Sequence, residues 1–383
     1  MDKNISGIKN CFGCGVCDLA CPKKIIQISP NKNGFYEPRI IDYDKCIHCG
    51  LCVDVCAFTH DELADDSHPL KSWGAWSQDE LTRLRATSGG VATELCRQLL
   101  ASGYKIIGCK YNYDTHRAEH AVADNLDDLN QFTGSKYMQS LTSPAFHDIN
   151  RSDKYVVIGT PCQIDSFRRY INRFKCQDRF ILIDFYCHNV CSINAWEAYR
   201  DFVSKRIGKI KYVSWRNKTV PSAGGRFIGW HDSYVMVLDG DNGEWVSSMR
   251  DNDLYYQLFF GDVCDNPACA KSCKYKYDRS SADIRLGDFW GEKYRSNQNG
   301  VNTVVAFTEK GVHLIESLSK VEKEEHPFYE AAGGQMRHNV SPRCLSFLVL
   351  YLLRHGVGLD SPLFKLVMLS QRVISKISHI IRK

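Results

Sequence analysis

Short apolar runs alternate with amphipathic stretches through most of the 383-residue chain. Runs that are rich in β-branched and aromatic residues predict buried strands at residues 104–111, 154–160, 179–187, 209–215 and 302–307. Apolar residues that recur at helical spacing predict helices at residues 90–103, 163–174 and 193–208. Strands that alternate with helices indicate an α/β domain with a mixed sheet, which we expect to cover residues 69–335.

Three other segments show different patterns. The stretch IIQISPNKNGFYEPRIID predicts a hairpin with its turn at Asn31–Gly34, inside an α+β domain expected over residues 1–68. A second hairpin is predicted to close at Asp239–Gly243. Residues 336–383 predict a C-terminal helical tail, in which basic residues lie beside an apolar stripe.

The composition is that of an ordinary globular protein, with 44% hydrophobic and 24% charged residues. The longest apolar stretch, LSFLVLYLL, has nine residues, about half of the ~18 that are needed to span a bilayer. The first ten residues are polar and show no secretion signal. We therefore expect a cytoplasmic protein.

The formal net charge of +5 is concentrated near the C-terminal end. No acidic residue follows Asp360, and five basic residues do: Lys365, Arg372, Lys376, Arg382 and Lys383. The rest of the chain is neutral, which argues against nucleic acid as a partner, because its binding needs a broad basic face. The tail is expected to pack on the body with its basic face in water. The alternative is peripheral contact with anionic membrane lipid.

Eight of the 18 cysteines form two runs with identical spacing. The runs are Cys11, Cys14, Cys17 and Cys21, followed by Pro22, and Cys46, Cys49, Cys52 and Cys56. This C-x2-C-x2-C-x3-C spacing is typical of bacterial ferredoxins with two 4Fe-4S clusters. In a long chain without an export signal, such grouping indicates metal or redox chemistry rather than disulfides.

The spacing also predicts which thiolates share a cluster. In such ferredoxins the fourth cysteine of each run ligates the cluster of the other run. The predicted sets are Cys11, Cys14, Cys17 with Cys56, and Cys46, Cys49, Cys52 with Cys21. A pair of structural zinc sites is the alternative, but zinc modules usually separate two C-x2-C pairs by a longer loop. The N-terminal domain is therefore predicted to be ferredoxin-like and to hold two 4Fe-4S clusters.

Further cysteines lie near the ends of predicted strands in the large domain. Cys162 lies at a strand-to-helix turn and Cys187 at the end of the next strand, the edge at which open α/β sheets bind ligands. A later loop brings together Cys264, Cys269 and Cys273. One cysteine from each strand end and two from this loop would supply four metal ligands. The sequence contains no G-x-G-x-x-G or P-loop motif, which argues against an ordinary NAD-binding Rossmann domain.

Five segments of the large domain carry a family resemblance. They are TSGGVATEL (87–95), GSKYMQS (134–140), GTPCQIDSFRR (159–169), IDFYCHNVCS (183–192) and ADIRLGDFWG (282–291). In these segments and their order, and in the cysteine runs before them, the chain resembles the coenzyme F420 hydrogenase/dehydrogenase beta-subunit family (FrhB/FdhB-like). The resemblance spans residues 73 to 292.

The resemblance implies an FAD- and iron–sulfur-dependent oxidoreductase that exchanges a hydride with a deazaflavin. The implied flavin contacts are Ser88, Gly89, Gly90, Ser135, Lys136, Tyr137, Asp288 and Trp290. The implied ligands of a third 4Fe-4S cluster are Cys162, Cys187, Cys269 and Cys273. The chain departs from the family pattern at Cys191, where many relatives have proline, and in the spacing of the last two cysteines, with Cys264 nearby. The ligands of a third cluster therefore stay open.

Two functions are compatible with these features. The first is an oxidoreductase in which FAD links one-electron clusters to a two-electron, hydride-exchanging substrate. The alternative is a non-catalytic electron-transfer subunit that serves a partner oxidoreductase. Expected partners are a redox protein or ferredoxin and a small hydride donor or acceptor. That molecule is a deazaflavin or, because bacterial relatives commonly occur among surface-polysaccharide genes, a sugar-related compound. No residue is assigned a catalytic role. We interpret His188 as a structural residue, because a lone histidine more often has that role.

Overall fold

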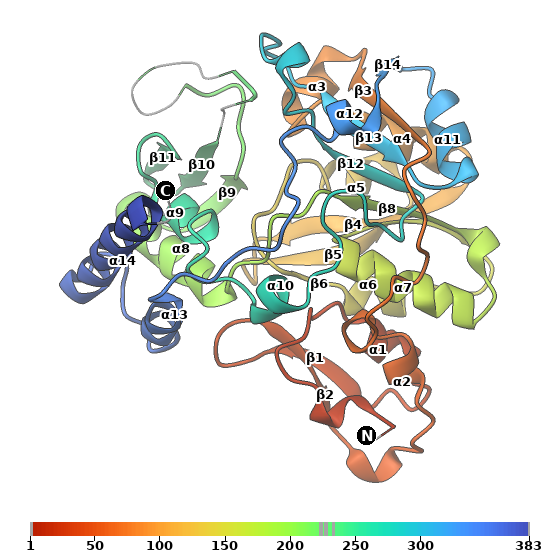
Figure 1. The fold of residues 1–383 in the computed structure, drawn as a ribbon, viewed down its shortest axis with the longest axis horizontal. Coiled ribbons are helices and arrows are strands. Elements are labelled where there is room, and N and C mark those ends of the chain that lie inside the picture. The colour runs from red at the N-terminus through yellow and green to blue at the C-terminus, as the bar shows by residue number, and fades with distance from the viewer. Residues whose placement is uncertain (1–2, 222–224, 226–228, 232–233, 382–383) are drawn as a thin grey trace.

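A hairpin and two short helices form the N-terminal unit, which lies at one end of the molecule (Figure 1). The computed structural model describes residues 3–221, 225, 229–231 and 234–381. The elements of the unit are α1 (Val16–Ala20), β1 (Ile26–Pro30), β2 (Tyr36–Ile40), α2 (Leu51–Asp54) and the 3-10 turns η1 (Ile5–Gly7), η2 (Tyr43–Lys45) and η3 (Ala57–Thr59). The Asn31 side chain accepts hydrogen bonds from the backbone N–H groups of Asn33 and Phe35, which confirms the predicted turn between β1 and β2.

A nine-stranded mixed sheet forms the centre of the molecule, in the order β14-β3-β13-β12-β8-β7-β4-β5-β6. Its strands are β3 (Lys71–Ser77), β4 (Tyr104–Asn112), β5 (Arg117–Ala123), β6 (Ser140–Leu141), β7 (Lys154–Ile158), β8 (Phe180–Phe185), β12 (Ile284–Asp288), β13 (Asn302–Ala306) and β14 (Val321–Glu325). The central run β4-β7-β8-β12 is parallel, whereas β12, β13, β3 and β14 pair antiparallel. The mixed sheet predicted from the sequence is thereby confirmed.

Helices cover both faces of this sheet. Successive side chains of a strand point to opposite faces, so neighbouring residues of β7 pack in different cores. Val156 of β7 packs in the core under α4 (Val91–Ala101) and α11 (Glu309–Glu316). Its neighbours Tyr155 and Val157 pack in the opposite core, under the helices α6 (Ser143–His147) and α7 (Pro161–Arg173). Helix α1 of the N-terminal unit packs on α6 and α7, so the unit is attached to this second face.

The other short elements of this region are α3 (Glu80–Arg85), α5 (Leu126–Asn130), η4 (Gln177–Arg179), α10 (Pro267–Lys271), η5 (Glu292–Tyr294) and α12 (Phe328–Ala331). No helix within the described ranges is long and apolar enough to span a bilayer.

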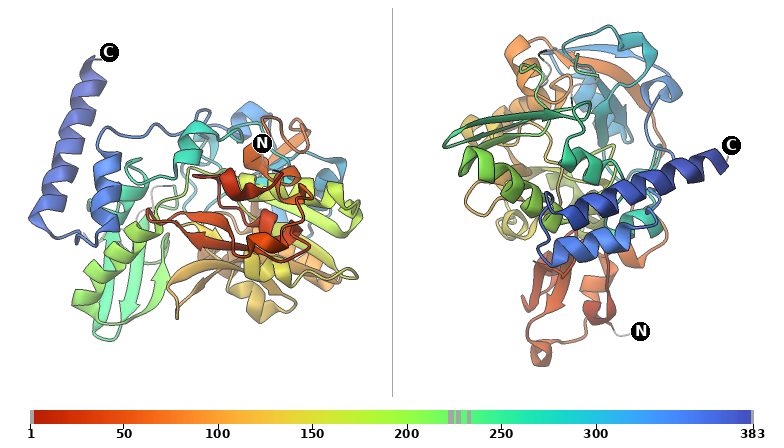
Figure 2. Two further views of the ribbon diagram at one scale, coloured as in Figure 1. Left: turned by 90° about the horizontal axis from the view of Figure 1, so that it is seen from below. Right: turned by 90° about the vertical axis from the view of Figure 1, so that its left-hand side faces the viewer.

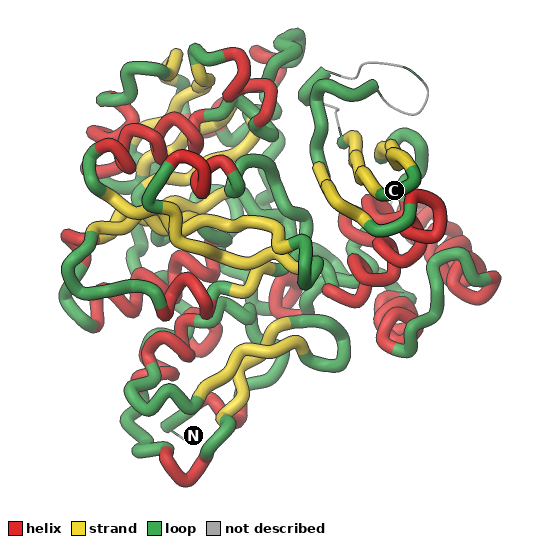
Figure 3. Tube along the Cα trace, turned by 180° about the vertical axis from the view of Figure 1, so that it is seen from behind, coloured by secondary structure: helices red, strands yellow, loops and turns green. Residues whose placement is uncertain are grey.

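A separate three-stranded antiparallel sheet lies beside the large sheet (Figure 3). Its strands are β9 (Ile210–Ser214), β10 (Val235–Gly240) and β11 (Gly243–Ser248). The strand predicted at 209–215 therefore exists, but it belongs to this smaller sheet. The hairpin predicted to close at Asp239–Gly243 is confirmed by the pairing of β10 with β11.

Four helices surround the small sheet: α8 (Ile193–Ile207), α9 (Leu254–Phe259), α13 (Ser346–Arg354) and α14 (Pro362–Ile381). Helix α8 begins at Ser192, whose hydroxyl caps the N–H of Asn194. It ends at Gly208, which adopts a positive φ of 75° that other residues rarely adopt. Its apolar face, which includes Trp196, fills the core against β10.

A fully buried ion pair joins the two central strands β8 and β12. The Arg285 guanidinium donates from Nε to Asp184 Oδ1 at 2.8 Å and from Nη2 to Oδ2 at 2.6 Å, and both side chains are 0% exposed. The remaining nitrogen of Arg285 donates to the carbonyls of Tyr275 and Tyr277, each at 3.1 Å. The pair therefore fixes the loop before β12 against the end of β8.

Arg285→Ala should lower the free energy of unfolding by about 3–5 kcal/mol, because it leaves the buried Asp184 carboxylate without its partner. Chemical denaturation in a fixed cofactor state measures the loss. The matched control is Arg295→Ala, which removes an exposed pair with Glu292 that is worth at most about 1 kcal/mol. Equal losses in the two variants would contradict the structural role of the buried pair.

Candidate metal centres

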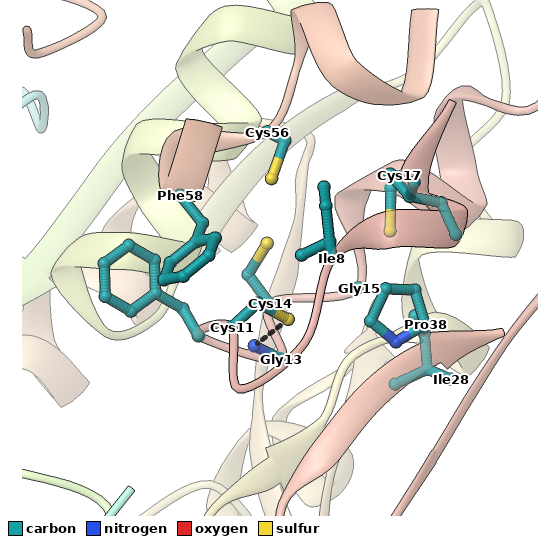
Figure 4. Close-up of a pocket in the computed structure, with 12 residues that line it drawn as sticks. Ile8, Cys11, Gly13, Cys14, Gly15, Cys17, Ile28, Pro38, Cys56 and Phe58 are labelled. Carbon is teal, nitrogen blue, oxygen red and sulfur yellow. Dashed lines mark hydrogen bonds between the residues drawn. The ribbon is translucent and has the colours of Figure 1, made fainter. Parts of the chain in front are cut away.

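Four cysteines from the two ends of the N-terminal unit line one pocket. Its lining includes Cys11, Cys14, Cys17 and Cys56 (Figure 4). The backbone N–H of Gly13 donates to Cys11 Sγ at 3.3 Å. We call this the first pocket, and its cysteines are the first set predicted from the spacing.

The second pocket lies at the other side of the unit and is lined by Cys21, Cys46, Cys49 and Cys52. Asn4 Nδ2 donates to Cys46 Sγ at 3.7 Å. Each of the two pockets is thus lined by four cysteines, as expected for two groups of one kind. The eight thiols thus sort into the two predicted sets, while ligation itself stays a prediction.

Glycines of the first run allow it to lie directly on the large domain. Gly13 has a φ of 66°, and a Cβ on it would come within 2.5 Å of Gln139 Nε2. A Cβ on Gly15, at a φ of 78°, would come within 2.2 Å of Thr142 Oγ1. Hydrogen bonds form at both close approaches: Gln139 Nε2 donates to the Phe12 carbonyl, and the Thr142 hydroxyl donates to the Cys14 carbonyl. The first pocket is therefore held against the sheet domain.

All four thiols of the first pocket, and Cys52 of the second pocket, are shielded from water. Burial raises the pKa of Cys11 to about 12 and that of Cys14 to about 11. Burial also raises the pKa of Cys52 to about 11. Without a metal, these three thiols therefore keep their protons at neutral pH, and a bound metal centre has to displace the protons. Within the described ranges, no three His, Cys, Asp or Glu side chains are arranged to hold a single metal ion.

A third cysteine group, Cys162, Cys187, Cys269 and Cys273, lies next to the first pocket. Burial raises the pKa of Cys162, and the nearby thiols of Cys187, Cys14 and Cys269 raise it further. Burial likewise raises the pKa of Cys269, with added effects from Cys187 and Cys273. The four thiols of the group therefore lie close enough to influence one another, and Cys162 also lies near Cys14.

Different elements supply this third cysteine group. Cys162 lies in the first turn of α7, and its Sγ is 3.2 Å from Thr160 Oγ1. Cys187 follows β8, while Cys269 lies in α10 and Cys273 just after it. Arg285, which pairs with Asp184 of β8, also holds the carbonyls of Tyr275 and Tyr277 shortly after Cys273.

Cys191 and Cys264 form a separate pair. Their sulfurs are 2.9 Å apart, and both side chains are fully buried in the core around the small sheet. Cys162 and Cys273 instead pack against a cluster that includes Phe12. The structure therefore favours the four cysteines of the third group over the other two thiols as a common set.

Two of the expected flavin-contact segments, the turn at Ser88–Gly90 and the segment that begins at Ser135, also come together. Thr87 Oγ1 lies 3.0 Å from Ser135 Oγ and accepts a hydrogen bond from the Ser135 backbone N–H at 2.9 Å. Gly89 lies against β3, where a Cβ would come within 2.5 Å of the Ala75 carbonyl oxygen. Gly90, at a φ of 84°, is the N-cap of α4. The Ser88 hydroxyl donates to the Val301 carbonyl at 2.8 Å.

The Lys136 side chain forms hydrogen bonds with the loop that precedes it in the sequence. Its ammonium donates to the carbonyls of Gln131, Phe132, Thr133 and Gly134 at 2.9–3.3 Å. This arrangement closes the loop before Tyr137, so the lysine positions the segment that carries the expected contacts.

Arg216 connects the remaining expected residues. Its guanidinium donates to Asp288 Oδ2 at 2.6 Å, lies over the Trp290 ring at 5.3 Å and neighbours Tyr137. Burial lowers the pKa of Arg216, but the negative charge of Asp288 outweighs it, so the pKa is raised overall. Arg216 therefore carries a permanent positive charge.

Lys218 lies between this group and the Ser88 turn. Its ammonium donates to the carbonyls of Ser88 at 2.9 Å and Asn299 at 2.8 Å. Sequence reasoning missed Arg216 and Lys218, because no motif surrounds them and only their burial identifies them.

His188 lies between the third cysteine group and Tyr137. Its Nε2 is 3.2 Å from Asp262 Oδ1, and its ring is 6.0 Å from Phe259. The Phe259 ring is 4.9 Å from that of Tyr137. Aromatic side chains therefore fill the space between the cysteines and the expected flavin contacts.

Comparison with known proteins first defines the class of the N-terminal unit. Residues 10–59 match the 4Fe-4S dicluster domain, so the unit is an iron–sulfur domain. The large domain matches the beta subunit of coenzyme F420 hydrogenase/dehydrogenase in two parts, the N-term at residues 72–146 and the C terminus at residues 152–327. The chain belongs to the coenzyme F420 hydrogenase/dehydrogenase beta-subunit family.

Two individual proteins show more limited likeness. NADH-quinone oxidoreductase subunit I of Pelobacter propionicus is 35% identical over 57 residues, which cover 13% of this chain and 31% of that protein. The chain thus spans about a third of that relative's length. A chain of the xenon-derivatized F420-reducing NiFe hydrogenase complex from Methanosarcina barkeri is 16% identical, with a TM-score of 0.46, over 78% of this chain and 91% of that chain.

Lys136→Met should lower the free energy of unfolding by about 1 kcal/mol, because the partly buried carbonyls of Phe132 and Thr133 lose their donor. The measurement is denaturant unfolding beside the control Lys320→Met, whose exposed side chain should contribute no more than about 0.5 kcal/mol. A variant as stable as the control would show that Lys136 does not hold the loop.

Proposed function

We propose that the chain is an FAD-dependent iron–sulfur oxidoreductase that moves electrons between its clusters and a hydride-exchanging substrate. One observation carries this proposal: Cys162 and Cys273 of the third group pack against a cluster with Phe12 and Phe58, which also line the first pocket. The second pocket, the first pocket and the third cysteine group therefore form a continuous series that leads from the N-terminal unit into the large domain.

The two pockets would each hold one 4Fe-4S cluster, and the third cysteine group would hold another. The eight N-terminal thiols would act as ligands in the two sets that line the pockets, as in two-cluster ferredoxins. The Ser166 hydroxyl lies beside Cys14, one of the four thiols of the first pocket. Its hydroxyl oxygen accepts from the Ala57 N–H at 3.0 Å and lies 3.2 Å from Cys14 Sγ. Its proton is therefore free to point at a Cys14 thiolate.

FAD would lie along the Ser88–Gly90 turn, the Ser135–Tyr137 segment and the end of β12, near Asp288 and Trp290. When bound, a flavin supplies the exchange between single electrons and hydride. The protein supplies the Arg216 guanidinium, which is paired with Asp288, and the Lys218 ammonium, whose pKa burial lowers to about 7; an anionic group bound nearby would favour the charged form of Lys218. The aromatic rings around Tyr137 exclude water from this region.

Electrons would enter at the second pocket from a redox partner protein or ferredoxin. Cys49 is exposed there, and Ile41, Tyr43 and Ile47 are 50–63% exposed around it. Exposed apolar side chains of this kind mark protein contacts. The small-molecule partner would be a deazaflavin or a sugar-related compound, and the protein would act in the cytoplasm.

Loss of the Ser166 hydroxyl should make one cluster harder to reduce. Hydrogen bonds to the sulfurs help to set cluster potentials, and a donor stabilises the more negative, reduced state. In Ser166→Ala we expect the midpoint potential of one cluster, that of the first pocket, to fall by about 20–60 mV, which corresponds to ~0.5–1.4 kcal/mol for a one-electron couple. A redox titration followed by electron paramagnetic resonance measures it, and an unchanged or higher potential would contradict the contact.

Iron and flavin analysis after anaerobic reconstitution tests the cofactors themselves. The wild-type protein should bind FAD and roughly twelve iron atoms per chain, and Cys187→Ser should retain roughly eight. Cys191→Ser is the matched control, because this thiol belongs to the separate pair, and it should keep the wild-type iron content. Bound iron without bound FAD would refute the proposed FAD-dependent activity. The non-catalytic electron-transfer subunit would then be the remaining function. A loss in Cys191→Ser instead of Cys187→Ser would refute the third ligand set.

A further inference from the structure

Helix α14 has two apolar faces, of which only one is packed. Phe364, Val367 and Met368 are buried in the core around the small sheet. A second set lies along the helix at spacings of three to four residues: Leu363, Leu366, Leu369, Val373 and Ile377. These five side chains are 49–60% exposed, and we call them the apolar stripe.

The position of α14 leaves the apolar stripe accessible. Figure 2 shows α13 and α14 side by side at one edge of the molecule, with α14 reaching beyond the body. Phe347 and Tyr351 of α13 are 71% and 55% exposed. A run of large apolar side chains on the surface marks an interaction site rather than a scattered surface residue.

Positive charge accompanies the apolar stripe. At 100° per residue, Lys365 and Lys376 fall immediately beside the stripe and away from the buried face. After Glu330 the sequence contains a single acidic residue, Asp360. This aspartate forms an ion pair with Lys205 of α8 at 2.9 Å. Helix α14 itself therefore combines exposed apolar side chains with basic side chains and has no acidic ones.

We propose that α14 binds the surface of an anionic lipid bilayer. An apolar stripe flanked by lysines is the pattern of helices that lie in the interfacial plane, with the stripe at the acyl boundary and the ammonium groups at the phosphates. Because α14 has no acidic side chains, a basic surface of another protein would find no opposite charge on it. This inference rests on exposure and charge alone and is independent of the proposed oxidoreductase function.

Flotation of the reconstituted full chain with vesicles tests the proposal. The protein should float with vesicles of phosphatidylcholine and phosphatidylglycerol and should bind pure phosphatidylcholine at least about tenfold more weakly. Lys365→Gln/Lys376→Gln should weaken binding to the anionic vesicles roughly 30-fold, since each lysine near such a surface contributes about fivefold. Leu366→Gln/Leu369→Gln should weaken it more than about tenfold on both vesicles.

The control is Leu81→Gln/Leu126→Gln, which removes two leucines of similar exposure from α3 and α5 and should bind like the wild type. Absence of vesicle binding, or equal binding of all variants, would overturn the proposal. So would a dimer in light scattering that Leu366→Gln/Leu369→Gln converts to a monomer, because the stripe would then be covered by a second copy of the chain.

Discussion

The buried Asp184–Arg285 pair is the interaction on which the arrangement of the large domain depends. It joins the neighbouring strands β8 and β12 at the centre of the sheet. Cys187 follows one of these strands, and the loop that Arg285 holds follows Cys273. Ser280 adds a hydrogen bond to Asp184 at 2.7 Å. Burying two charges is costly in itself, so the pair contributes specificity of arrangement more than stability.

A second buried carboxylate fastens the N-terminal unit to this frame. Asp165 of α7 accepts from the Ala64 N–H at 2.7 Å, the Ser281 hydroxyl at 2.6 Å and the Tyr275 hydroxyl at 3.1 Å. It lies three residues after Cys162, so the segment that leaves the iron–sulfur domain, the helix with Cys162 and the loop after Cys273 meet at one side chain. The series of cysteine groups is thereby built on rigid hydrogen-bonded contacts.

Much of this organisation could be predicted from local sequence patterns. The cysteine spacing predicted the two sets around the pockets, because ligand geometry within a short loop depends on spacing alone. The mixed sheet followed from the alternation of strands and helices. The placement of β9 in a separate sheet could not be predicted, since a short apolar run does not encode its neighbours. Arg216 and the Cys191–Cys264 pair were missed for the same reason: their partners lie far away in the sequence.

Electron flow from the N-terminal clusters through the third cysteine group to a flavin is the central claim of this account. Rapid mixing of FAD-reconstituted protein with reduced ferredoxin, followed by flavin absorbance, tests it most directly. The account predicts that the flavin is bleached in the wild-type protein, whereas in Cys187→Ser the N-terminal clusters are reduced and the flavin stays oxidised. Flavin reduction at the wild-type rate in Cys187→Ser would contradict it.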